Sequence, residues 1–250
     1  MPAQTIDEVI RALDDVVDGC KREADQIGYF AALYRRVTIA VKEGIARGEF
    51  EDGPRMERLD VIFANRYLAA LEQYRRSEPP TRCWAVAFDA TGKHLPIILQ
   101  QLLLGMNAHI NVDLGVAAAQ VASGDAFSSL KNDFNRINQV LASLLDRVQD
   151  QIDSLSPALA WLDRVGARND EAVVNFSIER ARDAAWSFAG QLAIAPAESR
   201  AGLIALRDEE IAALGRMVER PRPLVSLALL WIRLRESGDV ARNITVLGAP

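Results

Sequence analysis

The chain has 250 residues, half of them hydrophobic, which is enough for one large hydrophobic core. Its net charge of -5, with basic residues scattered among acidic ones, argues against a nucleic-acid partner, because phosphate binding needs a concentrated basic surface. The two cysteines, Cys20 and Cys83, exclude a disulfide framework and a cysteine-based zinc motif, and leave open a single disulfide between them.

Helix start and stop signals recur from the N-terminus onward, and no segment before the C-terminal tail has the pattern of a strand. Thr5 and Glu8 form a capping box that opens the first helix. The start of the chain lacks the basic and apolar regions of a signal peptide, so we expect a cytoplasmic protein. The helices predicted before the central segment span residues 5–20, 25–46, 52–78 and 81–88.

The segment from residue 95 to 121 contains no Lys, Arg or Glu and is the most apolar part of the chain. A helix that is apolar all round lies inside a fold, so this segment predicts a buried central helix that continues to about residue 123. It is long enough to raise the question of a membrane span, but the polar side chains within it lead us to expect no transmembrane segment. These side chains include Asn107, His109, Asn111 and Asp113.

The rest of the chain predicts further helices separated by short breaks, with Pro196 and Pro221 as the weak candidates for domain boundaries. These helices begin at about residues 125, 156, 170, 196 and 224. We find no internal repeat and no long linker. The sequence therefore predicts an all-α, single-domain multi-helix bundle over residues 1–242, built around the central helix at about residues 95–123, and an extended tail at 243–250.

His109 and Asp113 form the centre of the candidate site, because their spacing places them one turn apart on one face of the central helix. Three interpretations fit this spacing. The two side chains could ligate one divalent metal ion, which would be the cofactor. Asp113 could orient His109 as a general base. The pair could also do no more than satisfy each other's hydrogen bonds in a structural network.

Arg66 is the third candidate, because it interrupts the apolar stripe of its helix and a buried arginine needs an anion. We expect it to bind either Asp113 or an anionic substrate. Asn107 and Asn111 share a different face of the central helix, where they would tie a neighbouring helix or contact a substrate.

Two further charged residues, Asp133 and Arg180, lie in or beside the apolar stripes of later helices. We include both as substrate-binding candidates. The competing interpretation is a solvated or salt-bridged side chain, because charged residues are rarely buried.

The segment Asp14-Asp15-Val16-Val17-Asp18 resembles the aspartate-rich motif of class I terpene synthases and prenyl-diphosphate enzymes. In those enzymes carboxylates one turn apart hold magnesium against a diphosphate. The second metal motif of that class is not intact here, and a solvated acidic face is the competing interpretation. A magnesium-dependent enzyme using Asp14, Asp15 and Asp18 stays as a further alternative.

The spacing His109-x-x-x-Asp113-Leu114 is similar to an element of the zinc-dependent phospholipase C and nuclease fold. That family needs several more histidines for three zinc ions, and this chain has only His94 besides, which we expect to be exposed. A trinuclear site is therefore excluded. One metal ion held by His109, Asp113 and another carboxylate remains an alternative.

Several short segments together form a pattern that covers about residues 30 to 190. They are Tyr34-Arg35, residues 63–68, Trp84, residues 105–114, residues 133–135 and residues 180–186. With this pattern the chain resembles an uncharacterised bacterial family of helical proteins, a domain of unknown function, whose most specific part is the His-Ile-Asn-x-Asp-Leu core at residues 109–114. The resemblance implies a helical fold and no established activity. Within the pattern we include Tyr34 as a substrate-binding candidate.

We therefore expect an enzyme-like helical protein with a polar pocket around His109, Asp113 and Arg66, acting on a small anionic or lipid-like molecule. His109 would be the base or a ligand, Asp113 its orienter or co-ligand, and Arg66 an anion clamp. The alternative is a non-catalytic binding or scaffold protein in which these residues form a structural network. A His109 ring with both nitrogens bonded internally would contradict the first expectation.

Overall fold

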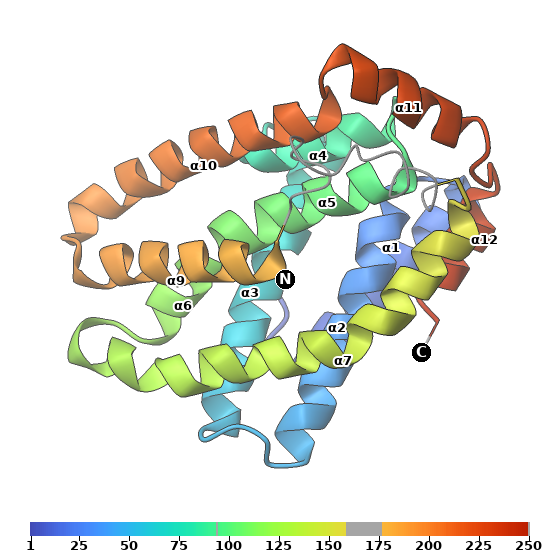
Figure 1. The fold of residues 1–250 in the computed structure, drawn as a ribbon. Helices are drawn as coiled ribbons and strands as arrows, with labels where there is room; N and C mark the ends of the chain where they lie inside the picture. Colours follow the sequence, from blue (N-terminus) through green and yellow to red (C-terminus); the bar gives the residue numbers. More distant parts are fainter. Residues whose placement is uncertain (94, 159–176, 250) are drawn as a thin grey trace.

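The computed structural model describes residues 1–93, 95–158 and 177–249, and these residues form helices joined by short loops (Figure 1). The described residues contain no β-strand, which confirms the predicted all-α fold class. The α-helices are α1 (Ile6–Glu23), α2 (Gly28–Ala46), α3 (Gly53–Arg75), α4 (Arg82–Thr91), α5 (Ile98–Ala108), α6 (Gly115–Val121), α7 (Lys131–Leu155), α9 (Ile178–Ile194), α10 (Ala197–Glu219), α11 (Pro223–Arg233) and α12 (Val240–Leu247). A π-helical turn, η1 (His109–Leu114), joins α5 to α6, and a 3-10 segment, η2 (Gly124–Leu130), precedes α7.

Side chains that cap backbone groups explain where the early helices begin. Thr5 accepts a hydrogen bond from the backbone N–H of Glu8, so the predicted capping position starts α1. Asp52 accepts a hydrogen bond from the N–H of Arg55 at the start of α3, where a proline occupies the first turn. Gly48 adopts a φ of 69° after α2, which is the left-handed conformation that glycine favours where a helix ends.

The segments α5, η1 and α6 form one continuous helix through the middle of the fold, with α9 and α10 on one side and α2 and α3 on the other (Figure 1). Two glycines allow neighbouring helices to approach it closely. A Cβ atom at Gly105 would lie 2.5 Å from the ring of Phe30, and one at Gly115 would lie 2.7 Å from the ring of Phe188. Larger residues at these positions would push α2 and α9 away from the central helix.

The middle of this helix differs from the regular α-helix that the sequence predicts. Residues His109–Leu114 form a π-helical turn, which is wider than an α-helical turn and is often found at functional sites. The sequence pattern does not signal the turn, because side chains four positions apart, such as His109 and Asp113, remain neighbours in it.

One described helical stretch, Ile98–Val121, is long and apolar enough to cross a membrane by length and composition. In the fold, 83% of its most apolar window is buried inside the protein. The core helix of a globular fold meets the same criterion, so this is weak support for a membrane span.

The prediction of an extended tail from residue 243 is wrong. This segment belongs to α12, which begins at Val240, and its residues Asn243 and Ile244 are fully buried. The helix packs against α1, α2 and α7, and these tertiary contacts are not visible in so short a segment. The helix predicted from residue 170 is described only from Ile178, and His94 lies outside the described residues.

Candidate functional site

The π-helical turn places His109 and Asp113 inside the fold, with exposed fractions of 3% and 1%. The Asp113 carboxylate is within hydrogen-bond distance of three nitrogen atoms: Nε of Arg66 at 2.7 Å, Nε1 of Trp84 at 2.8 Å and Nδ1 of His109 at 3.2 Å. Arg66 comes from α3 and Trp84 from α4, so two helices converge on this carboxylate. The structure thus brings the three predicted residues together, and it adds Trp84, which the sequence did not assign to the site.

Asp113 is ionised although it is buried. Burial by itself would raise its pKa, but the His109 hydrogen bond, the Arg66 charge and the Trp84 N–H together hold the pKa below its usual value. An ionised carboxylate can only accept hydrogen bonds, so Nδ1 of His109 carries the hydrogen in the bond between them.

His109 is a neutral ring with one free nitrogen. Burial lowers its pKa below the usual value although Asp113 opposes the shift, and the Arg66 charge lowers it further. Because Nδ1 carries the hydrogen, Nε2 presents a lone pair, and this buried atom has no hydrogen-bond partner among the described residues. The ring stacks on Phe63 with 3.5 Å between centroids, and the Tyr34 ring meets it edge-on at 4.5 Å.

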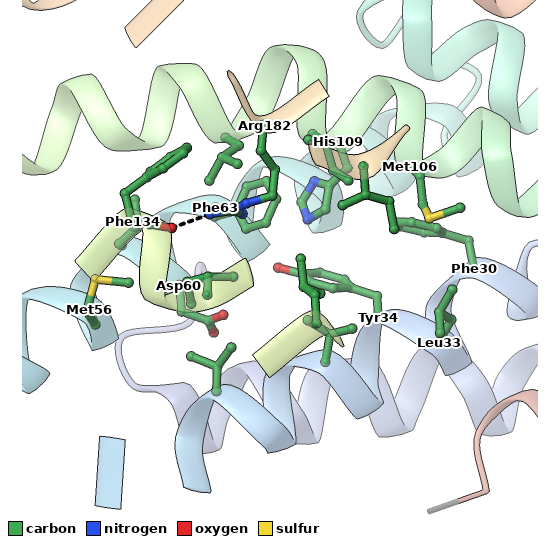
Figure 2. Close-up of a pocket in the computed structure, with 18 residues that line it drawn as sticks. Phe30, Leu33, Tyr34, Met56, Asp60, Phe63, Met106, His109, Phe134 and Arg182 are labelled. Carbon is green, nitrogen blue, oxygen red and sulfur yellow. Dashed lines mark hydrogen bonds between the residues drawn. The ribbon is translucent and has the colours of Figure 1, made fainter. Parts of the chain in front are cut away.

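His109 lines a cavity of about 110 Å³ whose walls are mainly apolar side chains (Figure 2). For comparison, a protein cavity of about 150 Å³ binds benzene. The cavity walls come from α2, α3, the central helix, α7 and α9. Its polar lining residues are Tyr34, Asp60, His109 and Arg182.

Asp60 and Tyr34, which also line the cavity, carry further buried polar atoms without hydrogen-bond partners among the described residues. Oδ2 of Asp60 and the hydroxyl of Tyr34 are buried without a hydrogen-bond partner among the described residues, and Figure 2 shows both groups facing the same space. Burial raises the pKa of Asp60 to about 7, and Glu57 adds to the shift. Burial also raises the pKa of Tyr34 well above its usual value, with a contribution from Asp60. At neutral pH Tyr34 therefore keeps its proton, and Asp60 is protonated in part of the molecules.

Arg182 of α9 brings a positive charge to the cavity wall. It is 4% exposed, and its guanidinium donates hydrogen bonds to the backbone carbonyl of Phe134 and to the side chain of Asn138. It also lies over the Phe134 ring, 4.5 Å from the centroid. Burial lowers the pKa of Arg182 to about 10 although Asp183 opposes the shift, so the side chain is charged at neutral pH.

Asn107 and Asn111, two of the predicted substrate-binding residues, contact α10 and do not line the cavity. Nδ2 of Asn107 donates to the carbonyl of Ile211 at 2.9 Å, and Nδ2 of Asn111 donates to the side chain of Asn107 at 3.3 Å. Arg207 donates to the carbonyl of Asn111 at 3.1 Å. These contacts match the other expectation for the pair, a tie to a neighbouring helix.

Asp133 and Arg180 also lie away from the cavity lining. The Asp133 carboxylate accepts hydrogen bonds from the backbone N–H groups of Glu51 and Asp52 and from the guanidinium of Arg55, so it fixes the loop before α3. Arg180 is exposed in the first turn of α9, in agreement with the solvated interpretation.

Two polar residues of the cavity, Asp60 and Arg182, were missed by the sequence analysis. Each shares a helical face with buried residues, which is the signal that could have revealed it. Asp60 precedes Ala64 by four positions and Tyr67 by seven, and Arg182 precedes Ala185 by three.

The aspartate-rich segment near the N-terminus does not form a metal cluster. Asp14 pairs with Arg35, and both Asp15 and Asp18 are exposed on α1. Within the described part of the chain, no group of three or more His, Cys, Asp or Glu side chains could hold a metal ion. At the central site, Asp113 already faces a charged guanidinium, which disfavours a second cation beside it.

The two cysteines take no part in the site. Both are buried free thiols, so the disulfide that the sequence left open is not formed. Burial raises the pKa of the Cys20 thiol to about 12, which leaves it unreactive at neutral pH.

Comparisons with curated proteins and with solved structures gave no match. A family model described as a family of unknown function, DUF5995, matches residues 6–221. The matched range contains all the residues that line the cavity and all the hydrogen-bond partners of Asp113. It also agrees with the resemblance to an uncharacterised helical family. The chain therefore belongs to the family of unknown function DUF5995.

Proposed function

We propose that the protein is an enzyme that abstracts a proton from a small, largely apolar molecule in the cavity, with His109 as the general base. The observation that carries this proposal is the free Nε2 of His109, a buried lone pair without a partner among the described residues, on a ring that lines the cavity. An unsatisfied buried polar atom costs roughly 1–3 kcal/mol. A ligand that presents a proton to Nε2 would satisfy it.

Asp113 is a positioning residue in this proposal. Its bond to Nδ1 fixes the tautomer and the orientation of the His109 ring, and its charge stabilises the imidazolium that forms when Nε2 takes a proton. Arg66 and Trp84 hold Asp113 in place and keep it ionised. Arg66 does not line the cavity, so it supports the base through Asp113 and does not clamp the substrate.

The lining of the cavity favours acid–base chemistry over covalent catalysis. The described lining residues include no Ser, Thr, Cys or Lys, which are the common nucleophiles. Tyr34 and the protonated form of Asp60 can donate hydrogen bonds to an oxygen of the ligand, where charge develops as the proton leaves. The reaction class supported by these groups is a proton transfer on the ligand.

The size of the cavity restricts the ligand to a compact molecule. A volume of about 110 Å³ is smaller than that of cavities that bind benzene, at about 150 Å³, so the enclosed part of the ligand is no larger than one ring or a short branched chain. Of the two classes expected from the sequence, a small molecule therefore fits better than an extended lipid chain.

A non-catalytic protein with a structural polar network is the second candidate. The contacts of Asn107 and Asn111 with α10 are of this kind, because each amide finds a partner within the protein. The buried polar atoms of His109, Asp60 and Tyr34 have no such partner among the described residues. This contrast favours an enzyme over a non-catalytic protein. A metal ion on His109 is less favoured, because its expected co-ligand Asp113 is engaged with three N–H groups.

The proposal is tested by hydrogen–deuterium exchange of bound ligands. Compounds of up to about ten non-hydrogen atoms are screened by ligand-observed NMR in D₂O, and the loss of ligand C–H signals reports proton abstraction. We expect the wild-type protein to catalyse exchange in at least one binder and His109→Gln to reduce the rate by about 100-fold or more. Asn107→Ala, on the opposite face of the same helix, should retain the wild-type rate. Exchange that is independent of His109 would contradict the proposal.

A further inference from the structure

Arg182 has no carboxylate partner among the residues that the structure describes, although it is almost fully buried. Its two hydrogen-bond acceptors, the Phe134 carbonyl and the Asn138 side-chain oxygen, are uncharged. Among the described residues, the carboxylate that raises its pKa, Asp183, is the next residue in the chain and is exposed to solvent. Among the described residues, the charge of Arg182 is therefore not neutralised by an ion pair.

An unneutralised guanidinium inside a protein is unfavourable. The effective penalty for burying an ion is several kcal/mol, and buried charges are normally paired. A guanidinium also carries five N–H donors, and Arg182 uses only two of them in hydrogen bonds with the described residues. Both the charge of Arg182 and its remaining N–H donors are therefore available to a group that enters the cavity.

Asp60, the other charged residue on the cavity wall, does not fill this role. The two side chains form no ion pair among the described residues, and Figure 2 shows them approaching the cavity from different sides. A carboxyl close to a guanidinium would have a lowered pKa, whereas the pKa of Asp60 is raised by burial without an opposing effect of Arg182. Its protonated form is neutral and would not repel an anion in the cavity.

We propose that the ligand of this cavity is a small carboxylate whose anionic group binds Arg182 and whose hydrocarbon part fills the apolar walls. This inference rests on the proposed function, since it names the substrate class of the same site. Guanidinium groups bind carboxylates through two parallel N–H donors, which matches the unused donors of Arg182. The remainder of the ligand then lies among apolar side chains with Tyr34, Asp60 and His109 within the same cavity. Arg182, and not Arg66, is the anion-binding residue.

Isobutyrate and isobutyramide provide the test, because they are small enough for the cavity, have nearly the same size and shape, and differ in charge. Each is titrated into ¹⁵N-labelled full-length protein at pH 6.5, and chemical-shift changes give the affinity and the location of binding. We expect isobutyrate to bind the cavity at least tenfold more tightly than isobutyramide. Arg182→Met should reduce this ratio to about one, whereas Arg180→Met, a matched change at a neighbouring exposed arginine, should leave it unchanged.

Arg182→Lys serves if the methionine variant does not fold, because it keeps the positive charge and loses the planar pair of donors. It should retain a reduced preference for isobutyrate. Equal affinities of the wild-type protein for the two compounds, or shifts that lie outside the cavity, would overturn the carboxylate inference. Absence of binding by both compounds would overturn it as well. The dependence of ligand proton exchange on His109 is a separate readout, so either proposal can fail while the other stands.

Discussion

Two buried aspartates near the cavity have opposite environments. Asp113 is 1% exposed, faces three N–H groups and has a lowered pKa. Asp60 is 7% exposed, its Oδ2 has no partner among the described residues, and burial raises its pKa to about 7. Because the degree of burial is similar, the donors that surround each carboxylate decide whether it is ionised.

This comparison separates the residues that hold His109 in place from those that line the cavity without a hydrogen-bond partner among the described residues. The Asp113 carboxylate, which has hydrogen-bond donors around it, stabilises the fold and orients the His109 ring. The Asp60 carboxyl, which lacks such donors among the described residues, reduces the stability of the fold. Buried groups of this kind persist where function requires them. The same distinction applies to two other groups. The Asp133 carboxylate has hydrogen-bond donors and fixes a loop, whereas Nε2 of His109 has no partner among the described residues.

The largest effect is expected from Asp113→Asn, because this carboxylate has hydrogen-bond donors and an ionic partner. The substitution removes the charge and leaves Arg66 without its ionic partner. Breaking a buried ion pair from one side costs roughly 3–5 kcal/mol, and the partial exposure of Arg66 leads us to expect about 3 kcal/mol here. Urea denaturation at pH 7 measures this loss of unfolding free energy. A loss below about 1 kcal/mol would show that Asp113 does not organise the site.

Asp60→Asn should have the opposite sign. The folded protein holds this carboxyl at a pKa of about 7, against an ordinary value of 3.8. The unfolded chain therefore loses the proton at lower pH, so the carboxyl destabilises the fold increasingly between about pH 4 and pH 7 and fully above. Burying the new amide offsets part of the gain, and we expect about 2 kcal/mol of stabilisation at pH 8 and almost none at pH 4. Thermal denaturation at both pH values measures it, and a destabilised variant at pH 8 would mean that Asp60 is structurally satisfied.

Asn107→Ala is expected to have the smallest effect of the three. It removes the hydrogen bond to the Ile211 carbonyl and the acceptor of Asn111, which costs about 1–2 kcal/mol in a buried position. The affinity for isobutyrate should stay within about twofold of the wild-type value, because this face of the helix does not line the cavity. A parallel loss of stability and affinity would show that the two faces are coupled.

The sequence predicts the part of the site that depends on local spacing. His109 and Asp113 are four residues apart on one helix, and Arg66 interrupts an apolar stripe, so their polarity stands out against apolar neighbours. Asp60 and Arg182 were not identified, although each shares a helical face with buried residues, because the sequence does not show that α2, α3, α7 and α9 meet around one cavity.

Two features of the fold could also not be predicted from local sequence patterns. The C-terminal helix α12 is buried by contacts with α1 and α2, which lie more than 190 residues away in sequence. The π-helical turn is not signalled by the sequence, because the spacing of its polar residues suits an α-helix equally well.

The most direct test of the central claim is the protonation state of His109 in long-range ¹H–¹⁵N spectra. The chain has only two histidines, so His94→Gln isolates the signals of His109. Between pH 6.5 and 8 we expect a neutral ring with hydrogen on Nδ1 and a bare Nε2, whose shift changes when a ligand binds the cavity. A ring that is charged at pH 7, or one that carries its hydrogen on Nε2, would contradict the account.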